Sequence, residues 1–367
     1  MVRAVVTGGG TSGHVVPAIA ILEMLEESGV ARSELRYVGS RRGIESTLMP
    51  DTGIDSVYLP ISGLQRSFSP RSIVRNLALP FRLLRCRIAA RRLVREWRPQ
   101  VVVSVGGYAS EPMAAAALAA GIPLVCVTYD RAPGLAVRRQ ARRATASAVA
   151  FPGVDLPRAH LVGAPVRAHL RRLDVAAGRA AARRELGMSD DELVVAVVGG
   201  SLGSGVLNAA VGGIMRECAT LPRVRVHHVC GTRNLTDEAP AVPAGVAYER
   251  TGYEPRMAQL YAACDLLVAR AGASTVAEIA TVGVASVLVP WSGASANHQE
   301  LNARWLSDEG AAVLVDEAGC ADGTLARTVA HLLADAGARA ALATAARRRG
   351  ELNRGNALVE LIGNAAG

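Results

Sequence analysis

The sequence predicts an α/β protein made of two doubly wound domains in tandem, and three observations support this prediction. Short apolar runs rich in Val, Ile and Leu alternate with longer amphipathic stretches along nearly the whole chain, which is the pattern of parallel βαβ units. A glycine-rich turn follows the first apolar run of each half. The length of 367 residues suits two domains of ordinary size. Because Gly163-Ala164-Pro165 interrupts the periodicity, we expect domains at residues 1–163 and 164–367.

The predicted strands and helices alternate in both halves. In the first half we expect strands at 4–7, 35–38, 57–61, 101–105, 124–127 and 148–151, and helices at 17–27, 72–97 and 113–120. In the second half we expect strands at 193–198, 224–229, 246–248, 266–269, 286–289 and 312–315, and helices at 176–186, 202–218, 274–282, 299–308, 323–334 and 338–362. Ligands of such sheets bind beyond the carboxyl ends of the strands. Two domains of this kind are therefore expected to face a central cleft, and the C-terminal helix packs on one of them.

The charged residues are unevenly distributed. All 41 basic residues are Arg, so a Schiff-base lysine and a P-loop lysine are excluded. Residues 1–163 carry 21 Arg against 11 acidic residues, whereas residues 164–367 carry 20 against 21. Ten Arg and a single acid, Glu96, fall within residues 64–98, where large apolar side chains alternate with them. This basic segment therefore accounts for the net charge of +9.

A basic amphipathic segment of this kind is typical of an anionic membrane surface or a lipid phosphate. Nucleic acid is not expected as a partner, because aromatic residues are few and no nucleic-acid-binding module is recognisable. A helix that is merely solvated remains the alternative. The chain opens on a strand-like run without a signal peptide, and its longest apolar run, 113–127, is too short to span a bilayer. We therefore expect a cytoplasmic protein that lies peripherally on the inner face of the plasma membrane.

The six cysteines do not indicate a metal site. None is spaced as Cys-x-x-Cys and no tight Cys/His cluster occurs. Reduced thiols in the core are favoured over disulfides or ligands, because several of the cysteines lie in apolar runs. We expect neither a metal nor another cofactor.

The first glycine-rich turn is Gly8-Gly9-Gly10-Thr11-Ser12-Gly13-His14, which leads from the first strand into the first helix. Glycines allow close backbone approach to a ligand, and the first turn of a helix presents N–H groups to an anion. A dinucleotide site is disfavoured, because Gly39-Ser40-Arg41 replaces the acid expected after the second strand. His14 is a candidate general base, and a capping or packing histidine is the alternative.

Two further turns occur in the second half. Gly199-Gly200-Ser201-Leu202-Gly203 follows the first strand there and suits a phosphate. Arg270 ends a later strand, Ser274 is a candidate N-cap, and Glu278 lies four residues further along the predicted helix. A carboxylate in that place can accept hydrogen bonds from paired sugar hydroxyls.

In this order the motifs resemble the MurG family of UDP-N-acetylglucosamine glycosyltransferases, which have the GT-B fold of two Rossmann-like domains. The resemblance extends over essentially the whole chain. It rests on Gly9–His14, Arg42–Glu45, Ile61–Leu64, Gly106-Gly107-Tyr108, Pro133-Gly134-Leu135, Gly163–Arg167, Gly199-Gly200-Ser201, Arg270–Glu278, and Gln299 with Asn302-Ala303.

The resemblance implies a role for individual residues. In the second domain it implies a site for a UDP-N-acetylhexosamine made of Arg167, Ser201, Tyr253, Met257, Arg270, Ala273, Ser274, Thr275, Glu278, His298 and Gln299. Of these, Ser201 and Arg167 would lie by the diphosphate, Tyr253 and Met257 by the uracil, and Glu278 by the ribose. In the first domain it implies an acceptor site made of Gly10, Thr11, Ser12, Gly13, Tyr108, Glu111, Thr128 and Tyr129. The catalytic base would be His14, with Asp130 as its substitute. The implied reaction inverts the anomeric carbon without a metal.

The sequence departs from the family mainly on the acceptor side. Val127-Thr128-Tyr129-Asp130 replaces the family's His-Glu-Gln-Asn, and Glu111 replaces a glycine. Gly163-Ala164-Pro165 and Leu202 also differ from the family pattern, but most of the donor signature is retained. This distribution favours a paralogue that transfers an N-acetylhexosamine to another prenyl-phosphate or pyrophosphate lipid, such as a precursor of moenomycin-type phosphoglycolipid antibiotics. The alternatives are transfer to lipid I in peptidoglycan synthesis, a UDP-N-acetylglucosamine 2-epimerase, and a non-catalytic nucleotide-sugar binding protein.

Overall fold

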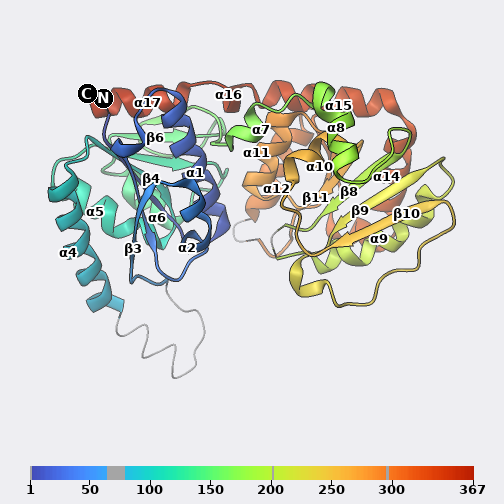
Figure 1. Ribbon diagram of the computed structural model, residues 1–367, viewed down its shortest axis with the longest axis horizontal. Helices are drawn as coiled ribbons and strands as arrows, with labels where there is room; N and C mark the ends of the chain where they lie inside the picture. The colour runs from blue at the N-terminus through green and yellow to red at the C-terminus, as the bar shows by residue number, and fades with distance from the viewer. Residues whose placement is uncertain (1, 64–78, 201, 295–296) are drawn as a thin grey trace. The chain divides into compact units, whose positions relative to one another are not determined.

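The computed structural model describes residues 2–63, 79–200, 202–294 and 297–367, which form two compact units (Figure 1). Unit 1 comprises Met1–Ala168 together with Gly355–Gly367, and unit 2 comprises His169–Arg354. The division therefore falls after Ala168 rather than after Gly163, and the end of the chain returns to unit 1.

Unit 1 is built on a parallel sheet with the strand order β3-β2-β1-β4-β5-β6-β7. Its strands are β1 (Ala4–Gly8), β2 (Leu35–Ser40), β3 (Asp55–Leu59), β4 (Val101–Gly106), β5 (Leu124–Thr128), β6 (Ala146–Val149) and β7 (Ala159–Leu161). The first six correspond to the predicted strands, with β3 and β6 each beginning two residues earlier than predicted. Strand β7 was not predicted, because its residues are all exposed and lack the apolar run that marks a buried strand.

The helices of unit 1 are α1 (Ser12–Glu27), α2 (Glu45–Leu48), α4 (Leu79–Trp97), α5 (Glu111–Ala119), α6 (Leu135–Ala141) and α17 (Ala357–Ala366). Short 3-10 turns lie at Arg32–Glu34, Pro50–Thr52 and Tyr108–Ser110. The predicted start of the first helix at Pro17 was wrong, because α1 already begins at Ser12 and contains Pro17 in its second turn. Residues 72–78 of the predicted second helix lie outside the described residues. The same holds for residues 64–78 of the basic segment, whereas residues 79–98 are described.

Unit 2 repeats the architecture with a parallel sheet of order β10-β9-β8-β11-β12-β13. Its strands are β8 (Leu193–Val198), β9 (Val224–Val229), β10 (Val246–Thr251), β11 (Leu266–Ala269), β12 (Ser286–Leu288) and β13 (Val313–Leu314). All six were predicted, although β10 is longer and β13 shorter than expected. The prediction of a doubly wound α/β fold is therefore confirmed for each unit by itself.

The helices from the joint to the end of unit 2 are α7 (Ala168–Arg171), α8 (Val175–Glu185), α9 (Gly205–Cys218), α10 (Met257–Ala263), α11 (Ala273–Val282), α12 (His298–Ser307), α13 (Glu317–Ala321), α14 (Thr324–Ala334), α15 (Ala336–Arg349) and α16 (Glu351–Arg354). A further 3-10 turn lies at Thr232–Asn234. The prediction of one helix over 338–362 was wrong, since the chain breaks it into α15, α16 and α17. A Cβ atom at Gly350 would lie 2.1 Å from the carbonyl oxygen of Ala280, so the break brings the chain directly against α11.

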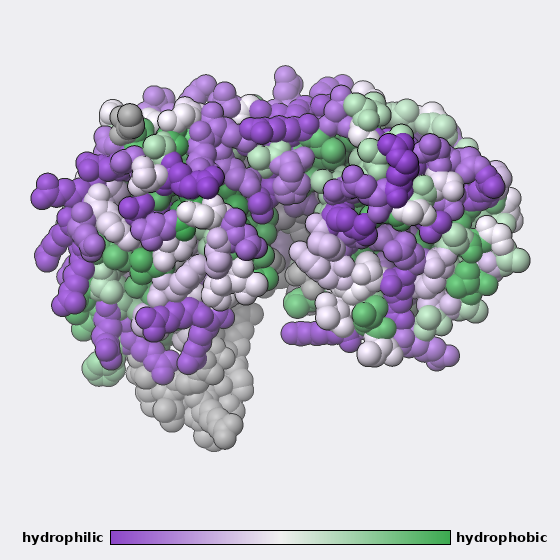
Figure 2. Space-filling model, in the orientation of Figure 1, coloured by the Kyte–Doolittle hydropathy of each residue, from purple (hydrophilic) through white to green (hydrophobic). Residues whose placement is uncertain are grey.

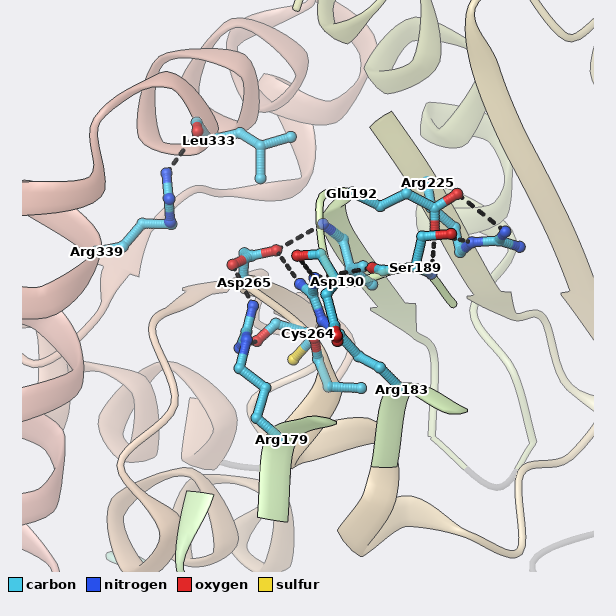
Figure 3. A network of polar contacts seen from close by, with 12 residues as sticks. Arg179, Arg183, Ser189, Asp190, Glu192, Arg225, Cys264, Asp265, Leu333 and Arg339 are labelled. Carbon is cyan, nitrogen blue, oxygen red and sulfur yellow. Dashed lines mark hydrogen bonds and ion pairs between the residues drawn. The ribbon is translucent and has the colours of Figure 1, made fainter. Parts of the chain in front are cut away.

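A buried network of arginines ties α8 to the sheet of unit 2 (Figure 3). Arg183 is 2% exposed, and its guanidinium donates to the carbonyl oxygens of Ala263, Ser189 and Asp190 and to the Asp265 carboxylate, at 2.7–3.1 Å. Asp265 also accepts from Arg179 and from the backbone N–H of Val194 at the start of β8. These contacts lie at the amino ends of β8 and β11, away from the ends that bind ligands in this fold, and we assign them to stability.

The two sheets reverse their strand order at equivalent places. In unit 1, the strands β1 to β3 are added toward one edge of the sheet and the strands β4 to β7 toward the other edge. In unit 2, the strands β8 to β10 and β11 to β13 are arranged in the same way. Ligand sites in doubly wound sheets lie at such switch points, beyond the carboxyl ends of the strands. The turns after β1 and β4 in unit 1, and after β8 and β11 in unit 2, are therefore the candidate ligand sites.

Candidate active site

The first glycine-rich turn lies at the switch point of unit 1, and a buried carboxylate holds it. Glu45 accepts hydrogen bonds from the backbone N–H groups of Gly10, at 3.2 Å, and Ser40, at 2.7 Å. Gly10 has φ of +95°, and a Cβ atom there would lie 2.5 Å from the Tyr108 ring. Only glycine fits at this position without strain. The turn is thus a preformed loop held between Glu45 on one side and Tyr108 on the other.

His14 lies in the first turn of α1, immediately after this loop. Its Nδ1 is 3.0 Å from Oγ1 of Thr11, the residue that precedes the helix. Burial lowers the pKa of His14, and the carboxylates of Asp130 and Glu45 offset this effect only in part. The imidazole is therefore neutral at pH 7, and when Nδ1–H donates to Thr11, Nε2 keeps a lone pair that can take a proton.

A small pocket brings His14 together with the residues predicted from the other acceptor-side segment. His14, Thr128, Tyr129 and Asp130 line the same space of about 50 Å³, which also contacts Gly107. Thr128 ends β5, so the carboxyl ends of β1, β4 and β5 all contribute to this place. The two candidate bases, His14 and Asp130, are thus adjacent.

A larger cavity of about 1010 Å³ lies beside it in unit 1 and also contacts His14 and Gly107. Its wall combines apolar side chains with four arginines, Arg87, Arg91, Arg139 and Arg143. Tyr108 and Glu111 belong to the same wall, and Nε of Arg87 donates to Oε1 of Glu111 at 2.9 Å. A cavity with apolar surface and several cations suits an apolar ligand that carries a negatively charged group.

In unit 2 the turn after β8 is closed by a helix cap. Ser204 is the N-cap of α9, where its Oγ accepts a hydrogen bond from the N–H of Leu207. A Cβ atom at Gly203 would lie 2.2 Å from the carbonyl oxygen of Cys230, so this turn packs against the one after β9. Ser201, the predicted phosphate ligand, lies outside the described residues.

Arg270, at the end of β11, links three loops at the switch point of unit 2. Its Nε donates to Oγ of Ser204 at 2.9 Å, and its NH1 donates to the carbonyl oxygens of Val289 and Pro290 at 3.2 Å. Its NH2 lies 2.6 Å from Oε1 of Glu317. With every nitrogen of the guanidinium engaged, Arg270 holds the loops of the site together, and its charge is neutralised by Glu317.

The amino end of α11 follows Arg270 directly. The prediction that Ser274 caps this helix was wrong: Gly272 occupies the N-cap position, and α11 begins at Ala273. Ser274 and Thr275 are therefore in the first turn, both half-buried, and no side chain of the described residues caps that turn. The exposed N–H groups of an uncapped helix start attract an anion such as a diphosphate.

Glu278 lies one turn further along α11 and is paired with a buried tyrosine. The hydroxyl of Tyr261, on α10, donates to Oε2 of Glu278 at 2.7 Å. Burial raises the pKa of Glu278 to about 7, and the Tyr261 hydrogen bond opposes this shift. Since Tyr261 engages only one carboxylate oxygen, Oε1 remains available to a hydroxyl group.

The other predicted donor residues of unit 2 lie in one loop and at the starts of two helices. Tyr253 is 63% exposed in the loop between β10 and α10, and Met257 is the first residue of α10. His298 is the first residue of α12. Oε1 of Gln299 accepts a hydrogen bond from the N–H of Trp291 at 3.0 Å, which holds the turn after β12.

Arg167 belongs to unit 1, and its expected place beside the diphosphate stays a prediction. Its Nε donates to Oε1 of Glu23, on α1, at 2.7 Å. The same carboxylate accepts the N–H of Ala168 at 2.8 Å. Arg167 thus fastens the end of unit 1 to its first helix.

Glu45, Glu317 and Tyr261 were not predicted as residues of these sites. Each acts on a residue distant in sequence, for example Glu45 on Gly10 and Glu317 on Arg270. Glu45 was visible only as part of the motif Arg42–Glu45. In the described parts of the chain no cluster of three or more His, Cys, Asp or Glu side chains is suited to a metal ion. Independence from a metal stays a prediction.

Comparison with solved structures defines the class of protein. The chain superposes on the crystal structure of Acinetobacter baumannii MurG with a TM-score of 0.77, at 27% identity, covering 99% of this chain and 100% of that one. The glycosyltransferase SnogD from Streptomyces nogalater has a TM-score of 0.65 over 99% of both chains, and at 19% identity it supports the fold alone. Together with the paired sheets and the turns at their switch points, these similarities define a glycosyltransferase with the GT-B fold.

Sequence comparison assigns the family. Residues 4–149 match the glycosyltransferase family 28 N-terminal domain, and residues 194–354 match its C-terminal domain. A Desulforudis audaxviator (strain MP104C) protein named UDP-N-acetylglucosamine--N-acetylmuramyl-(pentapeptide) pyrophosphoryl-undecaprenol N-acetylglucosamine transferase is 36% identical over 100% of this chain and 99% of its own length. A Nocardioides sp. protein of the same name is 38% identical over 94% and 93%. The chain therefore belongs to glycosyltransferase family 28.

Proposed function

We propose that this chain transfers N-acetylglucosamine from UDP to an acceptor carried on a prenyl phosphate or pyrophosphate. The observation that carries the proposal is the full-length similarity to transferases whose names state this donor and a pyrophosphoryl-undecaprenol acceptor. The geometry supports it, because each unit has a site suited to one of the two substrates. In this assignment the chain is a UDP-sugar-dependent hexosaminyltransferase, with the donor on unit 2 and the acceptor on unit 1.

The donor site is proposed at the switch point of unit 2. The uncapped first turn of α11, from Ala273 to Thr275, receives the diphosphate. Oε1 of Glu278 accepts a ribose hydroxyl while Tyr261 holds Oε2. Because Arg270 is already paired with Glu317, the helix dipole and backbone N–H groups stabilise the departing UDP, a role that needs no metal ion.

The acceptor site is proposed at the switch point of unit 1. Nε2 of His14 removes the proton from the acceptor hydroxyl as that oxygen bonds to the anomeric carbon of the donor, and the bond from that carbon to UDP breaks. The configuration of the carbon is thereby inverted. The lowered pKa of His14 keeps the base unprotonated at neutral pH, and Asp130 in the same pocket stabilises the imidazolium that forms.

The exposed side of α4 supports a membrane location for unit 1. Phe81, Leu84 and Ile88 are 75%, 56% and 44% exposed, and their spacing places them on one side of the helix. Figure 2 shows hydrophilic side chains, with apolar ones among them, along the edge of unit 1 where α4 lies. Within the described ranges, every helix is too short or too polar to cross a membrane. Peripheral binding to an anionic surface is therefore proposed.

Two acceptors fit this assignment. The relatives' names favour N-acetylmuramyl-(pentapeptide) pyrophosphoryl-undecaprenol. The second candidate is a phosphoglycolipid precursor of the moenomycin type, and the observation that favours it is the altered acceptor wall. Glu111 adds a carboxylate to the large cavity and engages Arg87, while Thr128, Tyr129 and Asp130 surround His14.

Release of UDP tests both the reaction and its acceptor. The purified protein is incubated with UDP-N-acetylglucosamine or UDP-N-acetylgalactosamine, and with lipid I or a prenyl-phosphate glycolipid without peptide. Release only with lipid I would eliminate the antibiotic precursor, and release only with the glycolipid would eliminate lipid I. A changed sugar without any acceptor would indicate a 2-epimerase instead. Binding of UDP without turnover under all conditions would indicate a nucleotide-sugar binding protein.

A further inference from the structure

A buried histidine of unit 2 lies between two carboxylates outside the groups assigned above. His227, on β9, has a side chain that is 0% exposed. Its Nε2 lies 3.2 Å from Oε2 of Glu254, and its Nδ1 lies 3.4 Å from Oε2 of Glu249. Glu249 is its direct partner across the β9–β10 pair, whereas Glu254 reaches it from the loop before α10. His228, the next residue, contacts Asn208 of α9 and Tyr248 instead.

Two carboxylates are the polar neighbours of the His227 ring. Neither nitrogen of His227 makes a well-aligned hydrogen bond within the described part of the chain. Each nitrogen nevertheless lies within 3.4 Å of a carboxylate oxygen, Nε2 beside Glu254 and Nδ1 beside Glu249. The Glu254 side chain is 3% exposed. Removal of His227 would take away the imidazole beside Oε2 of this buried carboxylate and leave it the contacts of Oε1 with Arg256, which is costly in a site of low dielectric.

Glu254 connects His227 to the backbone of the loop Gly252–Arg256. Its second oxygen, Oε1, accepts the N–H of Arg256 at 2.9 Å, and Arg256 is the N-cap residue of α10. On the other side of the loop, a Cβ atom at Gly252 would lie 2.9 Å from Cα of Thr232. The loop is therefore fixed at both ends, while Tyr253 between them is 63% exposed.

A large aromatic ring held in solvent on a fixed backbone is suited to stacking on a planar ligand, and base–aromatic stacking contributes about 1–3 kcal/mol. We propose that His227 is a positioning residue for the nucleotide base: acting through Glu254, it fixes the loop Gly252–Arg256 so that Tyr253 presents its ring to the base of UDP. This inference rests on the proposed donor. Preorganisation of the loop lowers the cost of ordering it when the nucleotide binds.

Calorimetric titration with UDP and with pyrophosphate, which has no base, tests the inference without requiring turnover. We expect His227→Gln to raise the Kd for UDP about tenfold and to keep the Kd for pyrophosphate within about twofold of the unaltered protein. Glu254→Gln is expected to act in the same direction, and the double variant to be no weaker than His227→Gln alone, because the two residues act as one unit.

The control is Glu192→Gln, which breaks the ion pair of Glu192 with Arg225 on the same strand β9. This variant is expected to lower Tm but to keep the Kd for UDP within about twofold of the unaltered protein. If His227→Gln lowers Tm while UDP binds as before, or if the binding of UDP and of pyrophosphate weakens equally, His227 serves stability only and the inference is wrong. If His227→Gln does not fold, Glu254→Gln decides by the same criteria. If the unaltered protein does not bind UDP, the proposed function is wrong and the inference with it.

Discussion

The two units use the same sheet architecture but treat their positive charges differently. In unit 2, buried and half-buried arginines are paired: Arg183 with Asp265, Arg225 with Glu192, and Arg270 with Glu317. In unit 1, Arg91, Arg139 and Arg143 line an open cavity together with Arg87, which pairs with Glu111, and the arginines of α4 are mostly exposed. The sequence shows the same contrast as a balance near zero in residues 164–367 and a clear excess of Arg in residues 1–163.

This difference indicates two ways to receive a phosphorylated ligand. Where arginines are consumed by internal pairs, as around Arg270, anion binding depends on the helix start of α11 and on backbone N–H groups. Such groups have fixed geometry and suit one small ligand. Where arginines line a cavity beside exposed apolar residues, they act through long-range charge and suit a lipid phosphate on a membrane.

The largest effect is expected at the proposed base of unit 1. His14→Ala should lower kcat by about 100- to 10,000-fold, because proton removal from the acceptor hydroxyl would lose its base. The KM for UDP-N-acetylglucosamine should not change, since the donor is assigned to unit 2. Initial rates of UDP release at saturating acceptor measure both. A kcat within about threefold of the unaltered protein would exclude His14 and direct attention to Asp130.

The pH dependence of kcat gives an independent check on His14. A general base works in its unprotonated form, and burial lowers the pKa of His14 below 6.5. The midpoint of the decline in rate should therefore lie below pH 6.5. A midpoint above pH 6.5 that disappears in His14→Ala would contradict the assigned environment of this residue.

A loss of stability without loss of affinity is expected at the buried network of unit 2. Arg183→Met removes the guanidinium that spans Ala263, Ser189 and Asp265, and should cost about 3 kcal/mol. Urea unfolding measures this loss, and the Kd for UDP measured at low temperature should be unchanged. Arg223→Met is the matched control, because Arg223 is 68% exposed in its pair with Asp191 and should cost less than about 1 kcal/mol.

The sequence predicted the sheets well and the sites in part, for a physical reason. Strands such as β4 are buried on both faces, so their apolar runs are continuous and easily recognised. The start of α1 was missed because Pro17 resembles the first residue of a helix. Glu45 contacts Gly10, Tyr261 contacts Glu278, and Glu254 contacts His227. The two residues of each pair are 17 to 35 positions apart in the sequence. No local pattern specifies such contacts, whereas glycine-rich turns are local and were found.

A pH effect on donor binding is expected from Glu278. Its pKa is raised by burial to about 7, and the carboxylate is the form that accepts a ribose hydroxyl on each available lone pair. UDP should therefore bind about tenfold more weakly at pH 6 than at pH 8, because only about a tenth of the protein is then ionised at this site. Glu278→Gln should bind UDP more weakly than the unaltered protein but with little change between the two pH values.

The raised pKa of Glu278 also predicts how the stability of a Gln variant at this position depends on pH. A carboxyl group whose pKa is higher in the folded than in the unfolded state favours folding at low pH, and this contribution is lost as pH rises from about 4.5 to about 7. Glu278→Gln should therefore raise Tm more at pH 8 than at pH 5. Glu309→Gln, an exposed acid of unit 2, is the control for both measurements. An equal effect of the two variants would remove Glu278 from the donor site.

The smallest effect is expected on the exposed side of α4, where each apolar residue acts nearly alone. Leu84→Asn removes one member of the stripe that Leu84 forms with Phe81 and Ile88. Burial of the exposed part of this leucine in a lipid interface contributes about 1–1.4 kcal/mol, so binding to vesicles containing phosphatidylglycerol should weaken about five- to tenfold. Leu352→Asn is the matched control, because Leu352 is 41% exposed on α16 of unit 2. If both variants sediment with vesicles as the unaltered protein does, α4 does not contact the membrane, and the arginines of unit 1 serve the acceptor alone.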